Sequence, residues 1–546
     1  MLPAGESRAP IWQACGIFFL VALLWSSAPF LDPRSLSGES FLGHDRSYAL
    51  FTADQLLAGK LLFRDVFYQY GALTAYLHAG WAKLFGNSIL AYWHLAQFLT
   101  CISVIQVWAL LRRSGSPWQA AALGVVVIFP YFLVPGGMAG GLLASVYVEL
   151  ERICLLAIAV AWKPASGRTF RVALCIGLWL GAMQWIKFGG AFVAGASLIA
   201  VDLLVLGLTR APKQAWLRWV RICLVTLAGF LAVEGILIAL AFALLPGPLA
   251  GEVLWPSWMV ENYRAYHDRT VSLFHWFNLN YFLGTQLPIV AACLANTWMA
   301  VRIFLNRKDV PREQAWSLRL AGPALFLAIF FCLALLIYLP HMWVATPYVW
   351  LILLPPLLFL REMNVLMRVA FCAACFPAFL LSAKNVVYPP HVDSFQEVQL
   401  AADRLWLSRE AAERIARLRS MLEILAREDA SEGPARPAIL GYPFGSGLHH
   451  FLGFPAATRH AWFMPGFVRP REEAELIRSL DRTFAVVVLF TEPLLGAPSP
   501  DPSSWEPFAT PVFTKETCQL FANRLLPPRQ VDSHCWLFPV TRPGEP

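Results

Sequence analysis

Eleven apolar runs, most of them about 20 residues long, fill much of the first 384 residues of this chain. A segment of this length crosses the hydrocarbon core of a bilayer as a helix. Only 14% of the residues are charged, against about 25% in a soluble domain. Soluble enzymes, disordered chains, collagens and disulfide-rich miniproteins are therefore excluded. The expected spans are 11–31, 88–111, 117–135, 143–162, 172–186, 188–208, 222–246, 281–301, 320–339, 345–360 and 369–384.

Basic residues are distributed unevenly between the two sets of loops. Loops on the side of the N-terminus hold 17 Lys and Arg residues in 63 positions, whereas the opposite loops hold 8 in about 105. The positive-inside rule then predicts a cytoplasmic N-terminus and an outward-facing segment from about residue 385. This asymmetry accounts for the net charge of +8. No zinc-finger spacing, RNA-binding signature or basic stripe points to nucleic acid.

The fifth expected span, 172–186, is short for a full crossing. It and the next span are expected to form a broken pair around Lys187. A lysine at the end of a span also reaches the interface with its charged end, so Lys187 has a purely structural alternative.

The segment 385–546 differs from the rest in composition and predicts a small α/β domain outside the membrane. Residues 394–428 have helical periodicity, and PREEAELIRSL reads as a helix with Pro470 near its start. The apolar stretches PAILGY, FAVVVLF and CWLFPV predict short buried strands. Gly445–Gly447 predicts a turn, and His449 and His450 follow it without the spacing of metal ligands. Whether Cys518 and Cys535 form a disulfide is left open.

A loop of about 56 residues, 32–87, joins the first two spans and contains two predicted helices. The first covers 46–59 and the second 73–85, and each ends at a glycine. Both are amphipathic but too short to span, which is typical of helices lying in the membrane interface.

Two carboxylates flank the first of these helices. Asp45 precedes it and has two alternatives, an N-cap or a catalytic base. Asp65 follows it in FRDVFYQYGAL and is either a turn residue paired with Arg64 or half of an acid/base or cation-handling pair.

The loop sequence HDRSYALFTADQLLAGKLLFRDVFYQYGALTAYLHAGWAKLFG resembles the first outer loop of the GT-C superfamily of glycosyltransferases that use polyprenyl-phosphate sugars. Asp45 matches the acidic position of that family, Gly59-Lys60 and Arg64-Asp65 match the next segment, and LFG at 84–86 the last. The family often has two contiguous acidic residues, whereas here Arg46 follows Asp45. More weakly, the segments GLWLGAMQWIKFGGAF and HMWVATPYVWLILLPPLLFL resemble later spans of the family. The C-terminal segment resembles the outer domain of bacterial members.

The resemblance implies a polytopic, mainly α-helical enzyme of the inner membrane, with residues 1–384 as the GT-C-like catalytic domain and 385–546 as a periplasmic domain. Such enzymes move a sugar, with inversion, from a polyprenyl-phosphate donor to an acceptor hydroxyl on a glycan, lipid or protein. Asp45 is then the expected base, with Asp65 as a second catalytic candidate. The expected phosphate-binding residues are Lys60, Arg64, Lys187, Arg264 and His341. The metal ligands are unknown and no cofactor is certain, although the resemblance allows a divalent metal.

Two other functions remain as alternatives. A transporter or flippase of a lipid-linked intermediate would also need many spans, but paired halves with matching broken segments are not found. A non-catalytic membrane assembly partner could keep the same fold.

Several charged residues lie within or near the spans and need partners there. Glu151 and Arg152 are adjacent, so a helix points them apart and each requires its own partner. Asp202 and Glu234 are expected to be structurally paired. Arg264 lies in an aromatic loop, and aromatic residues in such a loop more often anchor the interface than stack on a sugar.

Overall fold

The computed structural model describes part of the chain. The main described ranges are 45–113, 146–165, 167–254, 282–305, 315–338, 349–360, 363–387, 395–400, 403–428, 437–442, 445–461, 470–482, 485–490, 523–532 and 535–540. The expected span 117–135 and nearly all of 11–31 lie outside these residues.

The chain forms two compact units, each assembled from three separate segments. The first comprises Met1–Leu31, Trp93–Ala239 and Val271–Pro390. The second comprises Asp32–Tyr92, Leu240–Thr270 and His391–Pro546. The first outer loop therefore clusters with the C-terminal segment.

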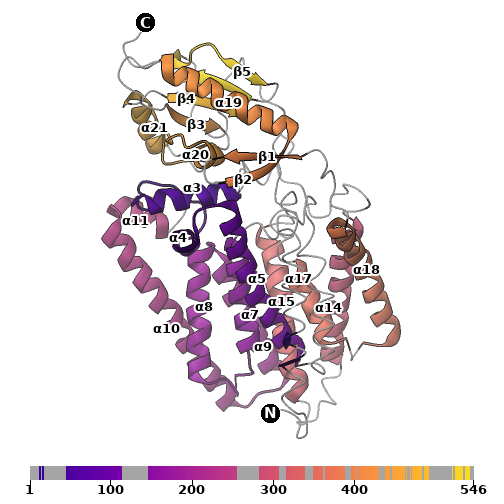
Figure 1. Ribbon diagram of the computed structural model, residues 1–546. Coiled ribbons are helices and arrows are strands. Elements are labelled where there is room, and N and C mark those ends of the chain that lie inside the picture. The colour runs from indigo at the N-terminus through magenta and orange to yellow at the C-terminus, as the bar shows by residue number, and fades with distance from the viewer. Residues whose placement is uncertain are drawn as a thin grey trace. The chain divides into compact units, whose positions relative to one another are not determined.

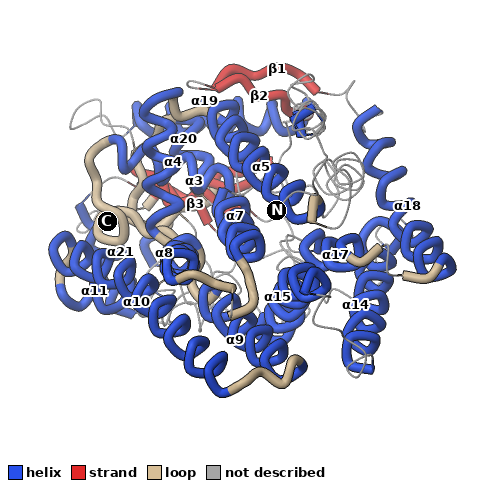
Figure 2. The backbone as a smooth tube through the Cα atoms, turned by 90° about the horizontal axis from the view of Figure 1, so that it is seen from below, coloured by secondary structure: helices blue, strands red, loops and turns tan. Residues whose placement is uncertain are grey.

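The first unit is a bundle of helices that follow the expected apolar runs. Within it α7, α8, α9 and α15 lie side by side, and α14 packs against α17 and α18 (Figures 1 and 2). Among the described helices, α5, α9 and α10 are long and apolar enough to cross a membrane. The helices are α5 (Ile89–Leu111), α7 (Val146–Ala161), α8 (Phe170–Ile186), α9 (Gly190–Leu208), α10 (Lys213–Leu244), α14 (Leu287–Leu305) with the π-helical turn η4 (Phe282–Gln286), α15 (Ala315–Tyr338), α17 (Val349–Leu358) and α18 (Val365–Val387).

Glycines bring α8 and α10 into close contact. A Cβ on Gly177 of α8 would overlap the carbonyl oxygen of Thr226, and a Cβ on Gly229 of α10 would overlap that of Leu174. Helices in lipid gain little from the hydrophobic effect, so small residues that let backbones approach stabilise their packing.

The expected break between the fifth and sixth spans is confirmed. Helix α8 ends at Ile186, Lys187 adopts an extended conformation, and α9 begins at Gly190 after Gly189 with φ of 90°. The left-handed backbone at Gly189 is one that other residues rarely adopt.

The C-terminal part of the second unit is an α/β fold around a mixed sheet with strand order β3-β4-β6-β5. Among the described strands of this sheet, β3 and β4 pair in parallel and the other pairs are antiparallel. Its core combines alternate residues of the strands with Phe463 and with Leu476 of α21. Helix α19 packs on β5 and on the β1–β2 hairpin (Figure 1). The elements are β1 (Phe395–Leu400), β2 (Asp403–Ser408), α19 (Arg409–Glu428), β3 (Ala438–Tyr442), α20 (Ser446–Leu452), α21 (Pro470–Arg482), β4 (Ala485–Phe490), β5 (Arg529–Asp532) and β6 (Cys535–Pro539).

The remaining helices of the second unit are α3 (Asp45–Leu57), α4 (Ala72–Phe85) and the short α11 (Gly247–Leu254). The two predicted loop helices are confirmed, and α3 and α4 meet through Ala53, Ala79 and Ala82. Helix α3 also packs directly on α20 (Figure 1).

Two expectations for the C-terminal segment were wrong. Residues 395–408 form the antiparallel β1–β2 hairpin, and the helix begins only at Arg409. Alternate burial of Asp403, Leu405 and Leu407 shows the period of two that the helical reading overlooked. Residues 446–452, expected as a turn and loop, form helix α20.

The three predicted strands and the helix starting at Pro470 are confirmed. Cys535 is buried in β6, and Cys518 lies outside the described residues.

Candidate functional site

Helix α3 begins at Asp45, the predicted base, whose side chain lies outside the described part of the structure. Buried contacts hold the first turn of this helix, which directly follows Asp45. The Oγ atoms of Ser47 and Ser446 are 3.0 Å apart, and the Tyr48 hydroxyl donates to the Phe67 carbonyl at 2.7 Å. The backbone that presents Asp45 is therefore fixed by packing within the second unit.

Three of the predicted site residues share the turn after α3. The Leu61 backbone N–H donates to Asp65 Oδ2 at 2.8 Å, and Arg64 Nε donates to Asp65 Oδ1 at 3.0 Å. Lys60 donates to the side-chain oxygen of Gln55. The turn thus has the geometry of the structural alternative, in which Asp65 is a turn residue paired with Arg64.

The charge state of Asp65 follows from the same contacts. The hydrogen bond from Arg64 lowers the pKa of Asp65 below its ordinary value, against the opposing effect of partial burial. A carboxylate with a depressed pKa is a weak proton acceptor near neutral pH. The catalytic role of Asp65 stays a prediction.

A buried cluster of charges surrounds Lys187 in the first unit. Its Nζ lies 4.0 Å from Glu151 Oε2 and 5.8 Å from the centre of the Tyr147 ring. On the same helix, Arg152 donates to Glu149 at 2.6 Å. The expectation that Glu151 and Arg152 need separate partners is confirmed.

Gly190 provides the space that Glu151 occupies. A Cβ at this first position of α9 would overlap Glu151 Oε1. The break between α8 and α9 therefore places Lys187 on one side of the Glu151 carboxylate and a residue without a side chain on the other.

Asp202 and Glu234 are each paired with other side chains within the bundle, as expected. Arg168 Nη2 donates to Asp202 Oδ1 at 2.7 Å, and Trp162 donates to the same carboxylate at 3.1 Å. Glu234 accepts a hydrogen bond from Trp185 at 3.0 Å.

The remaining predicted phosphate ligands, Arg264 and His341, lie outside the described residues. Among the others, the structure brings Lys60, Arg64 and Asp65 into one turn and gives Lys187 an acidic partner.

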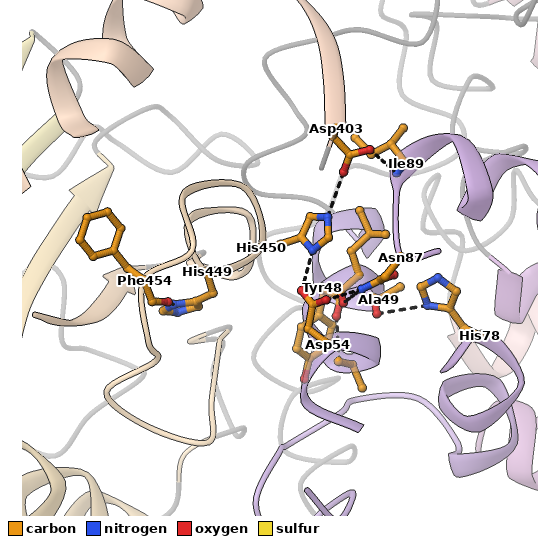
Figure 3. A network of polar contacts seen from close by, with 12 residues as sticks. Tyr48, Ala49, Asp54, His78, Asn87, Ile89, Asp403, His449, His450 and Phe454 are labelled. Atoms are coloured by element: carbon orange, nitrogen blue, oxygen red, sulfur yellow. Dashed lines mark hydrogen bonds and ion pairs between the residues drawn. The ribbon is translucent and has the colours of Figure 1, made fainter. Parts of the chain in front are cut away.

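Sequence reasoning missed a polar network centred on His450 of α20 (Figure 3). Its Nδ1 lies 2.6 Å from Asp54 Oδ2 of α3, and its Nε2 lies 3.0 Å from Asp403 Oδ2 of β2. Asp54 is 396 residues away in the chain, so no local spacing could have indicated the contact. The glycines at 445 and 453, which bound α20, were the available sign that His450 lies on a short helix.

None of the described His, Cys, Asp and Glu side chains form a group of three that could hold a metal ion. The two nitrogens of His450 face different carboxylates, which is a hydrogen-bonding arrangement and differs from ligands that converge on one cation.

The sequence matches no protein-family model and no curated protein. The fold is similar to that of ArnT from Cupriavidus metallidurans in the apo state, with a TM-score of 0.54, 13% identity and 98% of each chain covered. The same protein bound to undecaprenyl phosphate gives a TM-score of 0.52 at 13% identity, again over 98% of each chain.

A second similar structure is the archaeal oligosaccharyltransferase AglB from Archaeoglobus fulgidus, in complex with an inhibitory peptide and a dolichol-phosphate. It has a TM-score of 0.51 at 12% identity and covers 88% of this chain and 70% of its own. The fold of this mainly helical chain is therefore similar to that of both proteins, and among its described helices α5, α9 and α10 are long and apolar enough to cross a membrane.

Proposed function

We propose that this protein is a glycosyltransferase that moves a sugar from a polyprenyl-phosphate donor to an acceptor hydroxyl at the outer face of the inner membrane. The observation that carries the proposal is the likeness over 98% of both chains to ArnT in its complex with undecaprenyl phosphate. The lipid complexes of ArnT and AglB support a lipid-phosphate donor.

In the proposed reaction the acceptor oxygen forms a bond to C1 of the sugar while the bond from C1 to the phosphate oxygen breaks. The acceptor proton passes to a carboxylate, and the polyprenyl phosphate leaves as an anion. Inversion follows because the base and the leaving group lie on opposite faces of the sugar.

Asp45 is the proposed base. Its backbone starts α3, where the positive end of the helix dipole favours the ionised carboxylate. A base must be unprotonated before it can accept the acceptor proton. The buried contacts of Ser47 and Tyr48 hold the helix turn that carries it.

Cations are needed to stabilise the leaving phosphate. Lys187 is a buried candidate, and its ammonium group lies 4.0 Å from the Glu151 carboxylate. Lys60, Arg64, Arg264 and His341 complete the proposed set. The acceptor is a glycan, a lipid or a protein.

Replacing Asp45 with Asn tests the proposal. Membranes containing the Asp45→Asn variant, supplied with a panel of polyprenyl-phosphate sugars, should release polyprenyl phosphate about 100-fold or more slowly, because general-base catalysis contributes roughly that much. Glu423→Gln on the exposed face of α19 is the matched control and should retain wild-type release. Wild-type release by Asp45→Asn would remove Asp45 from the reaction.

The assay also separates the alternatives. A flippase would move the lipid-linked sugar across the membrane without releasing polyprenyl phosphate, and an assembly partner would do neither. Repeating the assay with EDTA tests for a divalent ion, since its chelation abolishes release only if a metal is required.

A further inference from the structure

His450 lies between two carboxylates that come from different parts of the second unit. Its Nδ1 is 2.6 Å from Asp54 Oδ2, and its Nε2 is 3.0 Å from Asp403 Oδ2 (Figure 3). A neutral imidazole has one donor and one acceptor nitrogen, so it would turn a lone pair toward one of these carboxylates. Only the imidazolium donates to both, and the geometry therefore assigns a proton to each nitrogen.

The surroundings favour this charged form. Burial opposes protonation, but the hydrogen bonds from His450 to Asp403 and Asp54, and their negative charges, outweigh it and raise the pKa of His450 to about 9. Among the described residues, His78 of α4 also interacts electrostatically with His450, and burial lowers the pKa of His78 to about 4. His78 is thus neutral near pH 7 and adds no competing charge.

Each carboxylate has a further partner. Asp54 Oδ1 accepts from Asn87 Nδ2 at 2.7 Å, and the same amide donates to the Leu50 carbonyl at 2.8 Å. Asp403 Oδ1 accepts from the backbone N–H of Ile89, the first residue of α5, at 2.9 Å. One imidazolium therefore joins α3, the turn before α5, β2 and α20.

Helix α20 is a rigid support for α3. Gly441 and Gly445 approach so closely that neither has space for a Cβ. The Gly445 N–H also donates to the Ala461 carbonyl at 2.8 Å. From this support Ser446 contacts the start of α3, and His450 contacts its C-terminal half.

We infer that His450 is a positioning residue for the proposed sugar transfer, in which its doubly paired imidazolium fixes α3, the helix that begins at Asp45, on α20 and β2 of the C-terminal fold. The inference rests on the proposed function, but the attachment of α3 is measurable without any substrate. Asp54 is 39% exposed at its side chain, whereas those of Asp403 and His450 are 5–6% exposed, so the bond to Asp54 lies at the accessible end of the network.

Disulfide trapping measures the attachment directly. The Oγ atoms of Ser47 and Ser446 are 3.0 Å apart, so cysteines at these positions bring their sulfur atoms within reach of a bond. With a mild oxidant at one fixed pH, the double variant Ser47→Cys/Ser446→Cys should crosslink rapidly. Adding His450→Gln should slow this crosslink at least fivefold, because both donors of the amide lie on one nitrogen and its acceptor oxygen would face one of the two carboxylates. Adding Glu423→Gln instead should leave it unchanged.

Asp54→Ala provides a second route if His450→Gln fails to accumulate. This substitution removes the carboxylate of α3 that pairs with His450, at a half-exposed position. The pair of His450 with Asp403 stays in place. It should slow the crosslink by a similar factor. A crosslink that forms at the same rate in folded His450→Gln or Asp54→Ala protein would overturn the inference.

The sugar-transfer assay then tests whether His450 positions α3 for the reaction. His450→Gln should lower kcat/KM for polyprenyl-phosphate release at least tenfold, because α3 carries Asp45 and leads into the turn that holds Lys60 and Arg64. The oxidised Ser47→Cys/Ser446→Cys disulfide should restore most of this loss, since it reattaches the same two helices. If the disulfide forms but release is not restored, the positioning role of His450 is contradicted.

The two proposals fail in different ways. If Asp45→Asn membranes keep wild-type release, the proposed base is wrong, yet the crosslinking rates still report on the attachment of α3. If crosslinking is independent of His450, the positioning inference is wrong while the transfer reaction is unaffected.

Discussion

His449 and His450 are neighbours in the chain but differ in charge. Burial lowers the pKa of His449 to about 4, despite its hydrogen bond to the Phe454 carbonyl. His450 is equally enclosed, but two carboxylates raise its pKa to about 9. A helix separates adjacent side chains by about 100°, so one ring faces a carbonyl and the other faces Asp54 and Asp403.

This difference predicts a pH-dependent stability. Because the pKa of His450 rises from 6.5 to about 9 on folding, its contribution is complete below about pH 6.5 and is lost as the pH rises through about 9. The shift corresponds to about 3 kcal/mol of unfolding free energy. The melting temperature of the detergent-solubilised protein should exceed that of His450→Gln at pH 6, and the gap should narrow by pH 9.5. A gap that is constant with pH would contradict the assigned charge.

Gly190 gives a second prediction at this scale. Gly190→Ala should displace Glu151 from Lys187 and lower the melting temperature by several degrees, because the new Cβ overlaps the carboxylate. Gly195→Ala, on the same helix α9, is the matched control, since no atom lies within 4 Å of its added Cβ. Thermal denaturation of the two variants checks this, and equal melting temperatures would refute it.

At the scale of elements, the contact between α8 and α10 depends on small residues. Gly177→Ala should force α8 and α10 apart by steric overlap with the Thr226 carbonyl. Gly235→Ala on α10, where the added Cβ meets nothing within 4 Å, should be tolerated. Yield and melting temperature after detergent extraction measure the effect. If Gly177→Ala has the same melting temperature as Gly235→Ala, the close approach of α8 and α10 contributes nothing to the stability of the protein.

Elements with strong local patterns could be predicted from the sequence. The two loop helices, the break at Lys187 and the strands β3, β4 and β6 follow from periodicity and from glycine positions. The β1–β2 hairpin could not, because 394–428 combines helix-forming residues with a short alternating stretch. Pairing of β1 with β2 and packing of α19 on both decide between the two periodicities.

At the scale of the whole molecule, the sequence predicts the class of fold but not the contacts that join its distant segments. The acidic position of Asp45 was recognisable by family resemblance. The partners of His450 were not, because they lie on segments that meet only through the tertiary fold. The pairing of Asp54 and Asp403 with one histidine depends on that fold and leaves no periodic signal in the sequence.

The charge asymmetry of the loops makes a prediction about topology. An alkaline phosphatase fusion to the C-terminus should be active, because this enzyme folds only outside the cytoplasm and the C-terminal domain is proposed to face outward. A fusion within 209–221, which carries four basic residues, should be inactive. The reverse activities would invert the proposed orientation.

The separation of 396 residues between Asp54 and His450 also has a consequence during biosynthesis. At translation rates of about 5–20 residues per second, the loop that contains Asp54 is made about 20–80 s before its histidine. Over that interval Ser47 and Asp54 lack Ser446 and His450, their partners in the finished protein. A ribosome that stops before α20 would release a chain with an incompletely covered loop, a form that quality-control proteases can recognise and degrade.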